Sequence, residues 1–227
     1  MPDATLENPA DRLADIRAQI AQACKIARRE ANGVQLIAVS KTRSAAEIRP
    51  LLHADHRCFG ENRVQEAAEK WPELRAEFPD VQLHLIGQLQ SNKAEVAVAL
   101  FDCIHSLDRM SLLDALAKAM AKYGRSLPCF VQVNIGKEPQ KGGCAIAELP
   151  ALLAAAKQRQ VKVIGLMCLP PADVEPAPYF ALLAELATRH GLSQLSMGMS
   201  DDFATAIQLG ATHIRVGTAL FGARGAV

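Results

Sequence analysis

One lysine stands where its amine could form a covalent bond with an aldehyde. Lys41 directly follows the apolar run LIAVS at 36–40, which has the composition of a buried strand. At the end of such a strand in a barrel, the side chain is directed towards the interior, where desolvation favours the neutral amine. A neutral amine attacks an aldehyde to form an imine. The position alone is equally compatible with a side chain that turns outward into solvent.

A second group of residues, near the C-terminus, has the composition of a phosphate site. Ser200 lies in a glycine-containing turn that opens a helical segment, where a hydroxyl and free backbone N–H groups favour a phosphate. Gly217 and Thr218 follow the last apolar run and offer further N–H donors, and barrel phosphate sites are often built after the seventh and eighth strands. Taken alone, Ser200 is more simply interpreted as a plain N-cap, because caps are commoner than ligand sites.

Arg215 is the third polar side chain in an unusual place, because it lies within the apolar segment THIRVG at 212–217. A buried arginine needs a partner, so it either pairs with a carboxylate or faces a ligand. His84, His105 and His213 also lie within apolar segments. For these three we expect satisfied core histidines, and we assign them no catalytic role.

The elements that position these residues are apolar runs alternating with amphipathic segments. Strand followed by helix, repeated, indicates parallel pairing. Eight such units favour a closed (β/α)8 TIM barrel over an open Rossmann sheet, and no GxGxxG fingerprint follows the first run. An open doubly wound sheet is the alternative if one of the two weakest runs belongs to a loop; these are 102–107 and 194–197. The predicted strands are 35–40, 56–60, 81–87, 102–107, 129–135, 161–167, 194–197 and 212–217.

An extra N-terminal helix is predicted before the first strand. Residues 9–31 place apolar side chains at helical spacing, with Asn8 as the cap, Pro9 in the first turn and Gly33 as the stop. Between the strands, the pattern predicts helices at 45–52, 64–78, 114–124, 147–159, 179–191 and 201–210.

Size and charge indicate a single domain, residues 1–227, around one large core. Because 25 basic residues balance 24 acidic ones, neither nucleic acid nor a membrane surface is an expected partner. No apolar run reaches the roughly 18 residues of a membrane span, and the N-terminus lacks a signal-peptide pattern, so we expect a cytoplasmic protein. The absence of a dimer-seam pattern favours a monomer.

The six cysteines lack CxxC or zinc spacing, which predicts reduced core residues and no metal site.

In combination, eight segments resemble the YggS/PROSC family of pyridoxal phosphate homeostasis proteins, and the similarity runs nearly end to end. That family looks like the barrel domain of alanine racemase without its second domain. The resemblance therefore implies a fold-type III barrel that binds pyridoxal 5′-phosphate (PLP). The segments are AVSKT (38–42), FGENRVQE (59–66), HLIGQLQSNK (84–93), HSLDR (105–109), VNIGKEPQKGG (133–143), GLMCLPP (165–171), LSMGMSDD (195–202) and IRVGTALFG (214–222).

The resemblance also implies individual cofactor contacts. Lys41 would hold PLP as a Schiff base, Ser200 would bind the phosphate together with two backbone groups of the last loop, and Arg215 would face the pyridine nitrogen. Two further residues would line the pocket, which are Asn62 and Met199. The complete implied set is Lys41, Asn62, Met199, Ser200, Arg215, Gly217 and Thr218.

These residues favour a PLP carrier over a catalyst. PLP is the better electron sink when its pyridine nitrogen is protonated and paired with an acid, and an arginine cannot accept that proton. Racemisation would then need strong acid and base groups. The two tyrosines, Tyr123 and Tyr179, lie in helical segments and not at strand ends. Racemases of this fold resemble two-domain proteins whose catalytic tyrosine comes from a partner's second domain, whereas this chain stops at Val227 after the barrel.

We therefore expect a non-catalytic protein that carries or buffers PLP in vitamin B6 homeostasis and could pass it to PLP-dependent apo-enzymes. A small fold-type III enzyme, such as an amino-acid racemase or lyase, is the alternative, and the absent tyrosine argues against it. A Schiff-base aldolase on the same barrel is a third interpretation. It would need no PLP, so cofactor colour distinguishes it.

Overall fold

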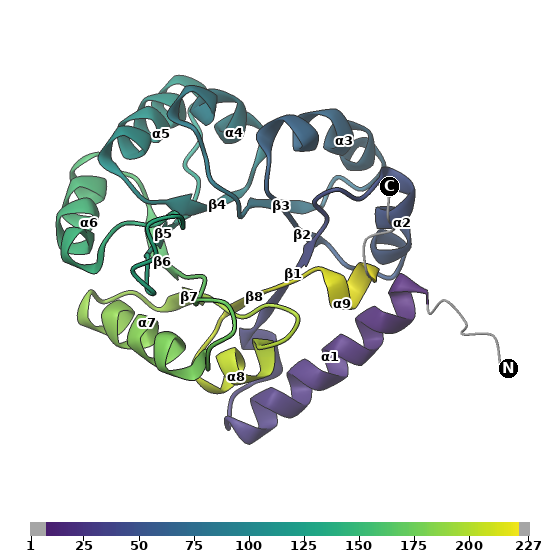
Figure 1. The fold of residues 1–227 in the computed structure, drawn as a ribbon. Helices are drawn as coiled ribbons and strands as arrows, with labels where there is room; N and C mark the ends of the chain where they lie inside the picture. The colour runs from purple at the N-terminus through teal and green to yellow at the C-terminus, as the bar shows by residue number, and fades with distance from the viewer. Residues whose placement is uncertain (1–7, 223–227) are drawn as a thin grey trace, which may run out of the picture.

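The strands of the chain form one closed parallel sheet. The computed structural model describes residues 8–222, and its strands are β1 (Gln35–Val39), β2 (Cys58–Glu61), β3 (Gln82–Leu85), β4 (Cys103–Leu107), β5 (Cys129–Gln132), β6 (Val163–Met167), β7 (Gln194–Ser196) and β8 (His213–Val216). They pair in sequence order, and β8 pairs with β1 to close the barrel (Figure 1). The predicted (β/α)8 barrel is confirmed. The open-sheet alternative is wrong, because both of the weakest predicted strands form and pair.

Helices surround this barrel on its outer side (Figure 1). The sequence pattern missed the helix between β3 and β4, whose segment AEVAVAL is short and lacks a clear polar face, and a single turn after β8. The α-helices are α1 (Pro9–Ile26), α2 (Ala45–His53), α3 (Val64–Glu77), α4 (Ala94–Leu100), α5 (Met110–Tyr123), α6 (Leu149–Gln158), α7 (Ala177–Arg189), α8 (Phe203–Gln208) and α9 (Thr218–Phe221). Short 3-10 turns occupy Ala31–Gly33, Ser91–Lys93 and Ile146–Glu148.

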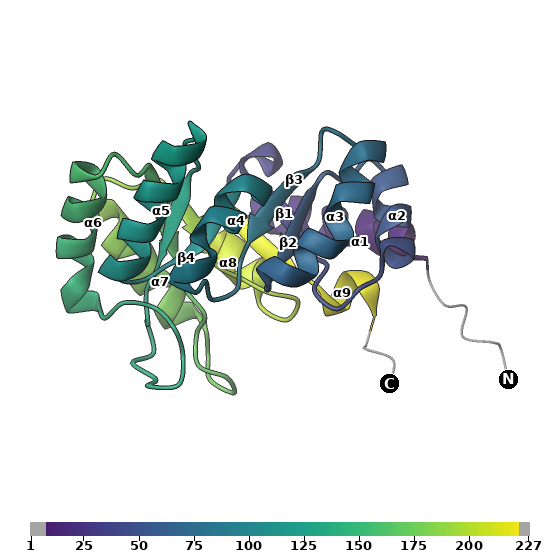
Figure 2. The same cartoon turned by 90° about the horizontal axis from the view of Figure 1, so that it is seen from above.

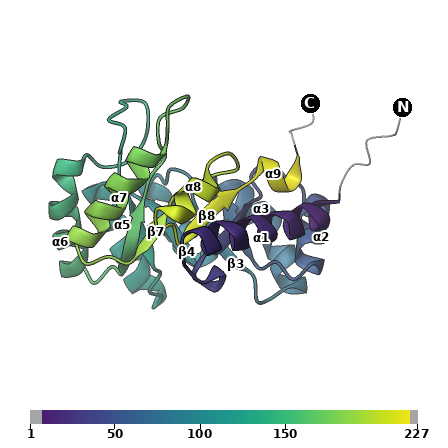
Figure 3. The same ribbon diagram turned by 90° about the horizontal axis from the view of Figure 1, so that it is seen from below.

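The N-terminal helix begins as predicted but ends earlier. The Asn8 side chain accepts a hydrogen bond from the amide of Ala10, so it caps α1. The helix stops at Ile26 and not at residue 31, because Arg28 takes a left-handed conformation with a φ of 54°. The Arg29 guanidinium then donates to the backbone carbonyl of Ile207, at the end of α8, and to that of Ala211, which follows this helix. Figure 3 shows α1 lying alongside α8 and α9.

Most of the hydrophobic core lies between the sheet and the helices. Phe59 on β2 and Trp71 on α3 are fully buried and pack with their ring centroids 5.1 Å apart. All six cysteines lie within residues 8–222 and are buried free thiols, as predicted. No helix in this range is both long and apolar enough to cross a membrane.

The carboxyl ends of the strands all open at one end of the barrel. Two long loops, residues 133–145 after β5 and 168–176 after β6, project from the end at which α9 lies (Figures 2 and 3). Lys141 joins the two loops by donating to the carbonyl oxygen of Pro170 at 2.8 Å. Because every βα loop emerges here, the residues that follow the strands are gathered at this end.

The interior of the barrel contains a chain of hydrogen-bonded polar side chains. Nδ1 of His105 lies 2.8 Å from Oγ of Ser196, and Nε2 of His105 lies 2.9 Å from Nδ1 of His84. The other nitrogen of His84 lies 3.6 Å from Sγ of Cys58. His213 pairs separately with the hydroxyl of its neighbour Thr212. His84 and His105 are therefore satisfied core residues, as the sequence pattern indicated, whereas His213 is hydrogen-bonded but only half-buried.

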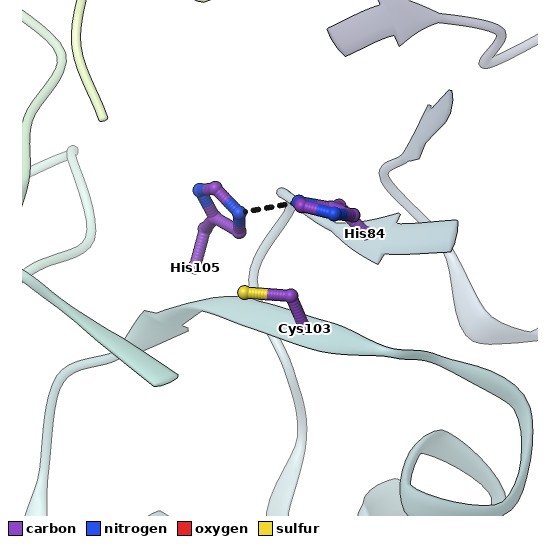
Figure 4. Close-up of side chains that lie close together, drawn as sticks. All are labelled: His84, Cys103 and His105. Atoms are coloured by element: carbon purple, nitrogen blue, oxygen red, sulfur yellow. Dashed lines mark hydrogen bonds between the residues drawn. The ribbon is translucent and has the colours of Figure 1, made fainter. Parts of the chain in front are cut away.

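Cys103 lies beside two of these rings and completes a cluster of metal-ligating side chains (Figure 4). The ligand atoms of His84, Cys103 and His105 all lie within 4.8 Å of one another. The ring nitrogens that face each other across this cluster share a hydrogen bond. Burial lowers the pKa of His105, and the positive charge of Arg215 adds to that effect. These contacts are those of a hydrogen-bonded core cluster.

The close approach of two site loops gives a first prediction about stability. Gly87 follows β3, and a Cβ there would lie 2.7 Å from the Cα of Asn62, which is backbone that cannot rotate away. We expect Gly87→Ala to lower the free energy of unfolding by about 1–3 kcal/mol, measured by urea denaturation. Gly33→Ala is the matched control, because nothing lies within 4 Å of a Cβ at that position. Equal stability of both variants would contradict the packing described here.

The buried histidines give a second prediction, about acid stability. Burial lowers the pKa of His84 to about 3 and the pKa of His213 to about 4, against 6.5 in the unfolded chain. Below pH 6.5 the unfolded state therefore binds protons that the folded state does not, so stability is lost as the pH falls towards 4. We expect a loss of more than about 2 kcal/mol over this window in urea titrations.

A pair of variants tests the assignment of this acid effect. His213→Asn removes one of the titrating groups and should make the decline shallower. His53→Asn, at an exposed position, should leave the slope unchanged. A stability that is flat across the window would show that the interior histidines bind protons equally well in both states.

Candidate functional site

The loop after β1 carries Lys41. Val39 is the last residue of the strand, Ser40 is fully buried, and Lys41 is half-buried at the carboxyl end of the barrel. The amide of Ser40 donates to the carbonyl of Gly60 on β2 at 3.0 Å, which continues the sheet up to the residue before the lysine. Thr42, the next residue, has a φ of 61°, so the chain turns sharply at this point. The lysine is therefore anchored to the sheet on one side and to a turn on the other.

Arg215 projects from β8 into the barrel. It is 4% exposed, and its Nη1 donates to Oγ of Ser196 at 2.7 Å while its Nη2 donates to the carbonyl of Cys168 at 2.9 Å. Among residues 8–222 it forms no ion pair with a carboxylate, although the charge of Asp202 acts on it from a longer range. Burial lowers the pKa of Arg215. Of the two predicted alternatives, pairing with a carboxylate is therefore wrong, and the neutral partners leave the charge of this buried guanidinium uncompensated.

Ser200 and the loop after β8 are brought together. The Ser200 hydroxyl accepts a hydrogen bond from the amide of Ala219, in the first turn of α9, at 3.4 Å. Ser200 is not the N-cap of α8, because the residue at that position is Asp202, whose carboxylate accepts from the amide of Met199. The N-cap interpretation of Ser200 is therefore wrong. Its oxygen is used in a contact with a segment 19 residues away.

Gly217 places this loop against the strand that leads to Lys41. A Cβ at Gly217 would lie 3.3 Å from the Cβ of Val39 and 3.5 Å from its carbonyl oxygen. The neighbouring turn is equally tight at Gly198, which has a φ of 95° and would clash with Ala206 if it carried a side chain. Thr218 is exposed and begins α9, where first-turn amides have no intrahelical acceptor.

The remaining two predicted pocket residues lie at the same end of the barrel. Asn62 directly follows β2 and is half-buried, and its backbone contacts the loop at Gly87. Met199 follows β7 and is 40% exposed. Two residues that no sequence pattern indicated also contact predicted site residues or their loops, namely Lys70 and Ser196. The only available signal for Lys70 was its position four residues after Glu66 on one helix face.

The two tyrosines of the chain lie in the outer layer of helices. Tyr123 is the last residue of α5 and is 45% exposed. Tyr179 lies in the first turn of α7 and packs against the core on the outer side of the barrel. Tyr123 therefore lies at the opposite end of the barrel, whereas Tyr179 follows the loop after β6 at the carboxyl end, with its side chain packed in the helical layer.

Comparisons with known proteins agree with this arrangement. The model of the alanine racemase N-terminal domain matches residues 12–225. The pyridoxal phosphate homeostasis protein of Pseudomonas aeruginosa is 42% identical over 221 residues, which is 95% of each chain. The protein of the same name from Aquifex aeolicus is 38% identical over 227 residues, covering 96% of this chain and 99% of its own.

Solved structures show the same similarity. PipY of Synechococcus elongatus, solved with PLP bound, is 43% identical, with a TM-score of 0.82 over 94% of this chain and 100% of its own. Alanine racemase of Clostridium difficile has a TM-score of 0.71 over 97% of this chain and 58% of its own, and at 14% identity the similarity shows the fold alone. The chain therefore belongs to the family of pyridoxal phosphate homeostasis proteins, which has the barrel of the alanine racemase N-terminal domain.

Proposed function

We propose that this chain binds PLP at the carboxyl end of the barrel, as a Schiff base on Lys41, and carries or buffers it without turnover. The observation that carries the proposal is that the Lys41 loop, the Ser200 turn and the start of α9 meet there, with Arg215 buried beneath. PipY, 43% identical over its whole length, was solved with PLP bound. The relatives named pyridoxal phosphate homeostasis protein span the same length as this chain.

The polar groups at this end fit the chemistry of PLP. The Ser200 hydroxyl accepts from Ala219, which leaves its own proton free to be donated to a phosphate oxygen. First-turn amides at Thr218 can add further donors. Arg215 presents a buried positive charge, which suits an unprotonated pyridine nitrogen. Asn62 and Met199 would line the pocket at the ends of β2 and β7.

The same residues support carriage and not catalysis. When bound, PLP supplies an electron sink, which is strongest with a protonated pyridine nitrogen. Arg215 can only donate hydrogen bonds, so it cannot support that protonation. Neither Tyr123 nor Tyr179 projects from a strand end, and Tyr179 is packed against the core in the helical layer, which argues against a tyrosine acid or base in the site. We therefore propose that residues 1–227 act as one PLP-holding domain that releases its cofactor to PLP-dependent apo-enzymes.

The first test of the proposal is chemical trapping. Incubation with PLP followed by borohydride reduction should place a single adduct on Lys41, identified by peptide mass spectrometry. Lys41→Ala should abolish the adduct, while Lys118→Ala, on α5, should not. Adducts scattered over surface lysines, or none, would contradict the proposed site. A PLP-loaded protein that turns over amino acids would contradict the non-catalytic assignment.

The phosphate contact makes a separate prediction. Ser200→Ala removes one neutral donor to a charged phosphate, so the Kd for PLP should rise by about 10-fold to 100-fold. The Kd for pyridoxal, which lacks the phosphate, should change little. Ser193→Ala, at an exposed position before β7, is the matched control. An equal change for PLP and pyridoxal in a fluorescence titration would exclude a direct contact between Ser200 and the phosphate.

A further inference from the structure

A second lysine forms hydrogen bonds to the loop that carries Lys41. Lys70 lies on α3, and its side chain is only 9% exposed. Its Nζ donates to the carbonyl oxygen of Ser40 at 2.8 Å and to the carbonyl oxygen of Arg43 at 3.1 Å. These two carbonyls lie immediately before Lys41 and two residues after it. One ammonium group thus donates hydrogen bonds to both ends of the turn that contains the predicted Schiff-base lysine.

Two carboxylates hold this ammonium in place. Oε1 of Glu61 lies 2.7 Å from Lys70 Nζ, and Oε1 of Glu66 lies 3.1 Å from it. Glu61 is fully buried, and the same oxygen accepts hydrogen bonds from the Ser40 hydroxyl at 2.6 Å and from the Trp71 indole at 3.0 Å. A buried carboxylate of this kind is stabilised by its cationic partner and its hydrogen bonds.

Glu66 adds a contact inside the turn. Its Oε1 accepts a hydrogen bond from the amide of Thr42 at 2.5 Å. Thr42 is β-branched and has a φ of 61°, a strained conformation that persists only where the surroundings enforce it. Lys70 and Glu66 stabilise this conformation of Thr42, because together they bind the carbonyls on both sides of the turn and the amide within it. The backbone conformation of the turn determines the direction in which Lys41 leaves the chain.

The bonding of Lys70 also separates the roles of the two lysines. An ammonium has three donors, and four acceptors surround the one on Lys70. Its donors are therefore committed to the loop and the two carboxylates. Lys70 therefore holds the loop and is not itself the lysine proposed to react with the aldehyde, although both lysines lie near the same turn.

From this geometry we infer that Lys70 is a positioning residue for the covalent attachment of PLP. It fixes residues 40–43 so that the amine of Lys41 meets the aldehyde, and Glu61 and Glu66 fix Lys70 in turn. This inference rests on the proposed function. It predicts that loss of the Lys70 ammonium impairs the bond between Lys41 and PLP while leaving the noncovalent pocket intact.

The experiment compares two probes in three variants. PLP has the aldehyde, whereas pyridoxamine 5′-phosphate has an amine in its place and cannot bond to Lys41. Lys70→Met keeps the length of the side chain and removes its charge, and Lys70→Arg restores a charged donor. Lys122→Met is the matched control, because Lys122 also pairs with a glutamate, Glu95, but lies on the exposed face of α5.

We expect Lys70→Met to slow formation of the visible-absorbing Schiff base with PLP on the order of 10-fold to 100-fold, because small misplacements of a reacting group have effects of this size. The affinity for pyridoxamine 5′-phosphate should stay within about twofold, which is the normal scatter for a change away from the pocket. Lys70→Arg should recover part of the rate, and Lys122→Met should match the wild type. Circular dichroism and thermal melting establish that each variant is folded.

Two results would overturn the inference while leaving the proposed function standing. One is an unchanged rate of Schiff-base formation in Lys70→Met. The other is an equal loss of affinity for both probes, which would mean that Lys70 only maintains the fold. Should Lys70→Met fail to fold, Glu66→Ala removes the Thr42 contact at a half-buried position and must show the same selective slowing. If the wild type itself forms no adduct on Lys41, the proposed function fails, and the inference fails with it.

Discussion

The pairing of the last strand with the first is the interaction on which the rest of this structure depends. β1 and β8 align in parallel from Gln35 opposite His213 to Ala38 opposite Val216, and this ladder closes the barrel. Closure brings the loop after β8 beside the loop after β1, so that Gly217 packs directly on Val39. An open sheet would leave these two strands at opposite edges. The loop that carries Lys41 and the loop after β8 would then not lie at a common site.

Closure also creates an interior that must be filled, and this protein fills part of it with polar groups. The guanidinium of Arg215 donates to Ser196, which bonds to His105, which in turn bonds to His84. Because Arg215 can only donate, its bond to Ser196 has a fixed direction. Burial lowers the pKa of both His84 and His105, and the positive charge of Arg215 adds to the effect on His105. A protonated ring in this chain would add a second buried positive charge beside the arginine, so the cluster is stable near neutral pH.

Outside the sheet, a second polar cluster performs a different task. Glu61 points away from the interior and gathers donors from Ser40, Lys70 and Trp71, which belong to the first loop and to α3. Burial of an ion pair is weak evidence for stability in itself. Its effect here is geometric, because it joins a helix to the backbone on both sides of Lys41. The interior cluster thus supports the charge of Arg215, and the outer cluster supports the loop that carries the lysine.

The sequence by itself determined the barrel and most of its elements, because a strand or helix leaves a local record of which face is buried. Even β7 was predicted, from the four-residue run QLSM. Eight regular repeats of strand and helix are compatible with few other folds. The resemblance to homeostasis proteins came from eight local segments in the same order. The end of α1 and the short helices α4 and α9 were missed, because a left-handed Arg28 and one-turn to two-turn helices leave almost no periodic signal.

Only the tertiary structure decided which side chains meet. Ser200 bonds to Ala219 and not to its own helix, Arg215 bonds to Ser196 and Cys168 and not to a carboxylate, and Lys70 reaches the backbone around Lys41. Each of these contacts joins segments that are 19 to 47 residues apart in the chain. Amino-acid spacing encodes the face on which a residue lies, but the pairing of distant loops is set by strand register and barrel closure, which no local pattern contains.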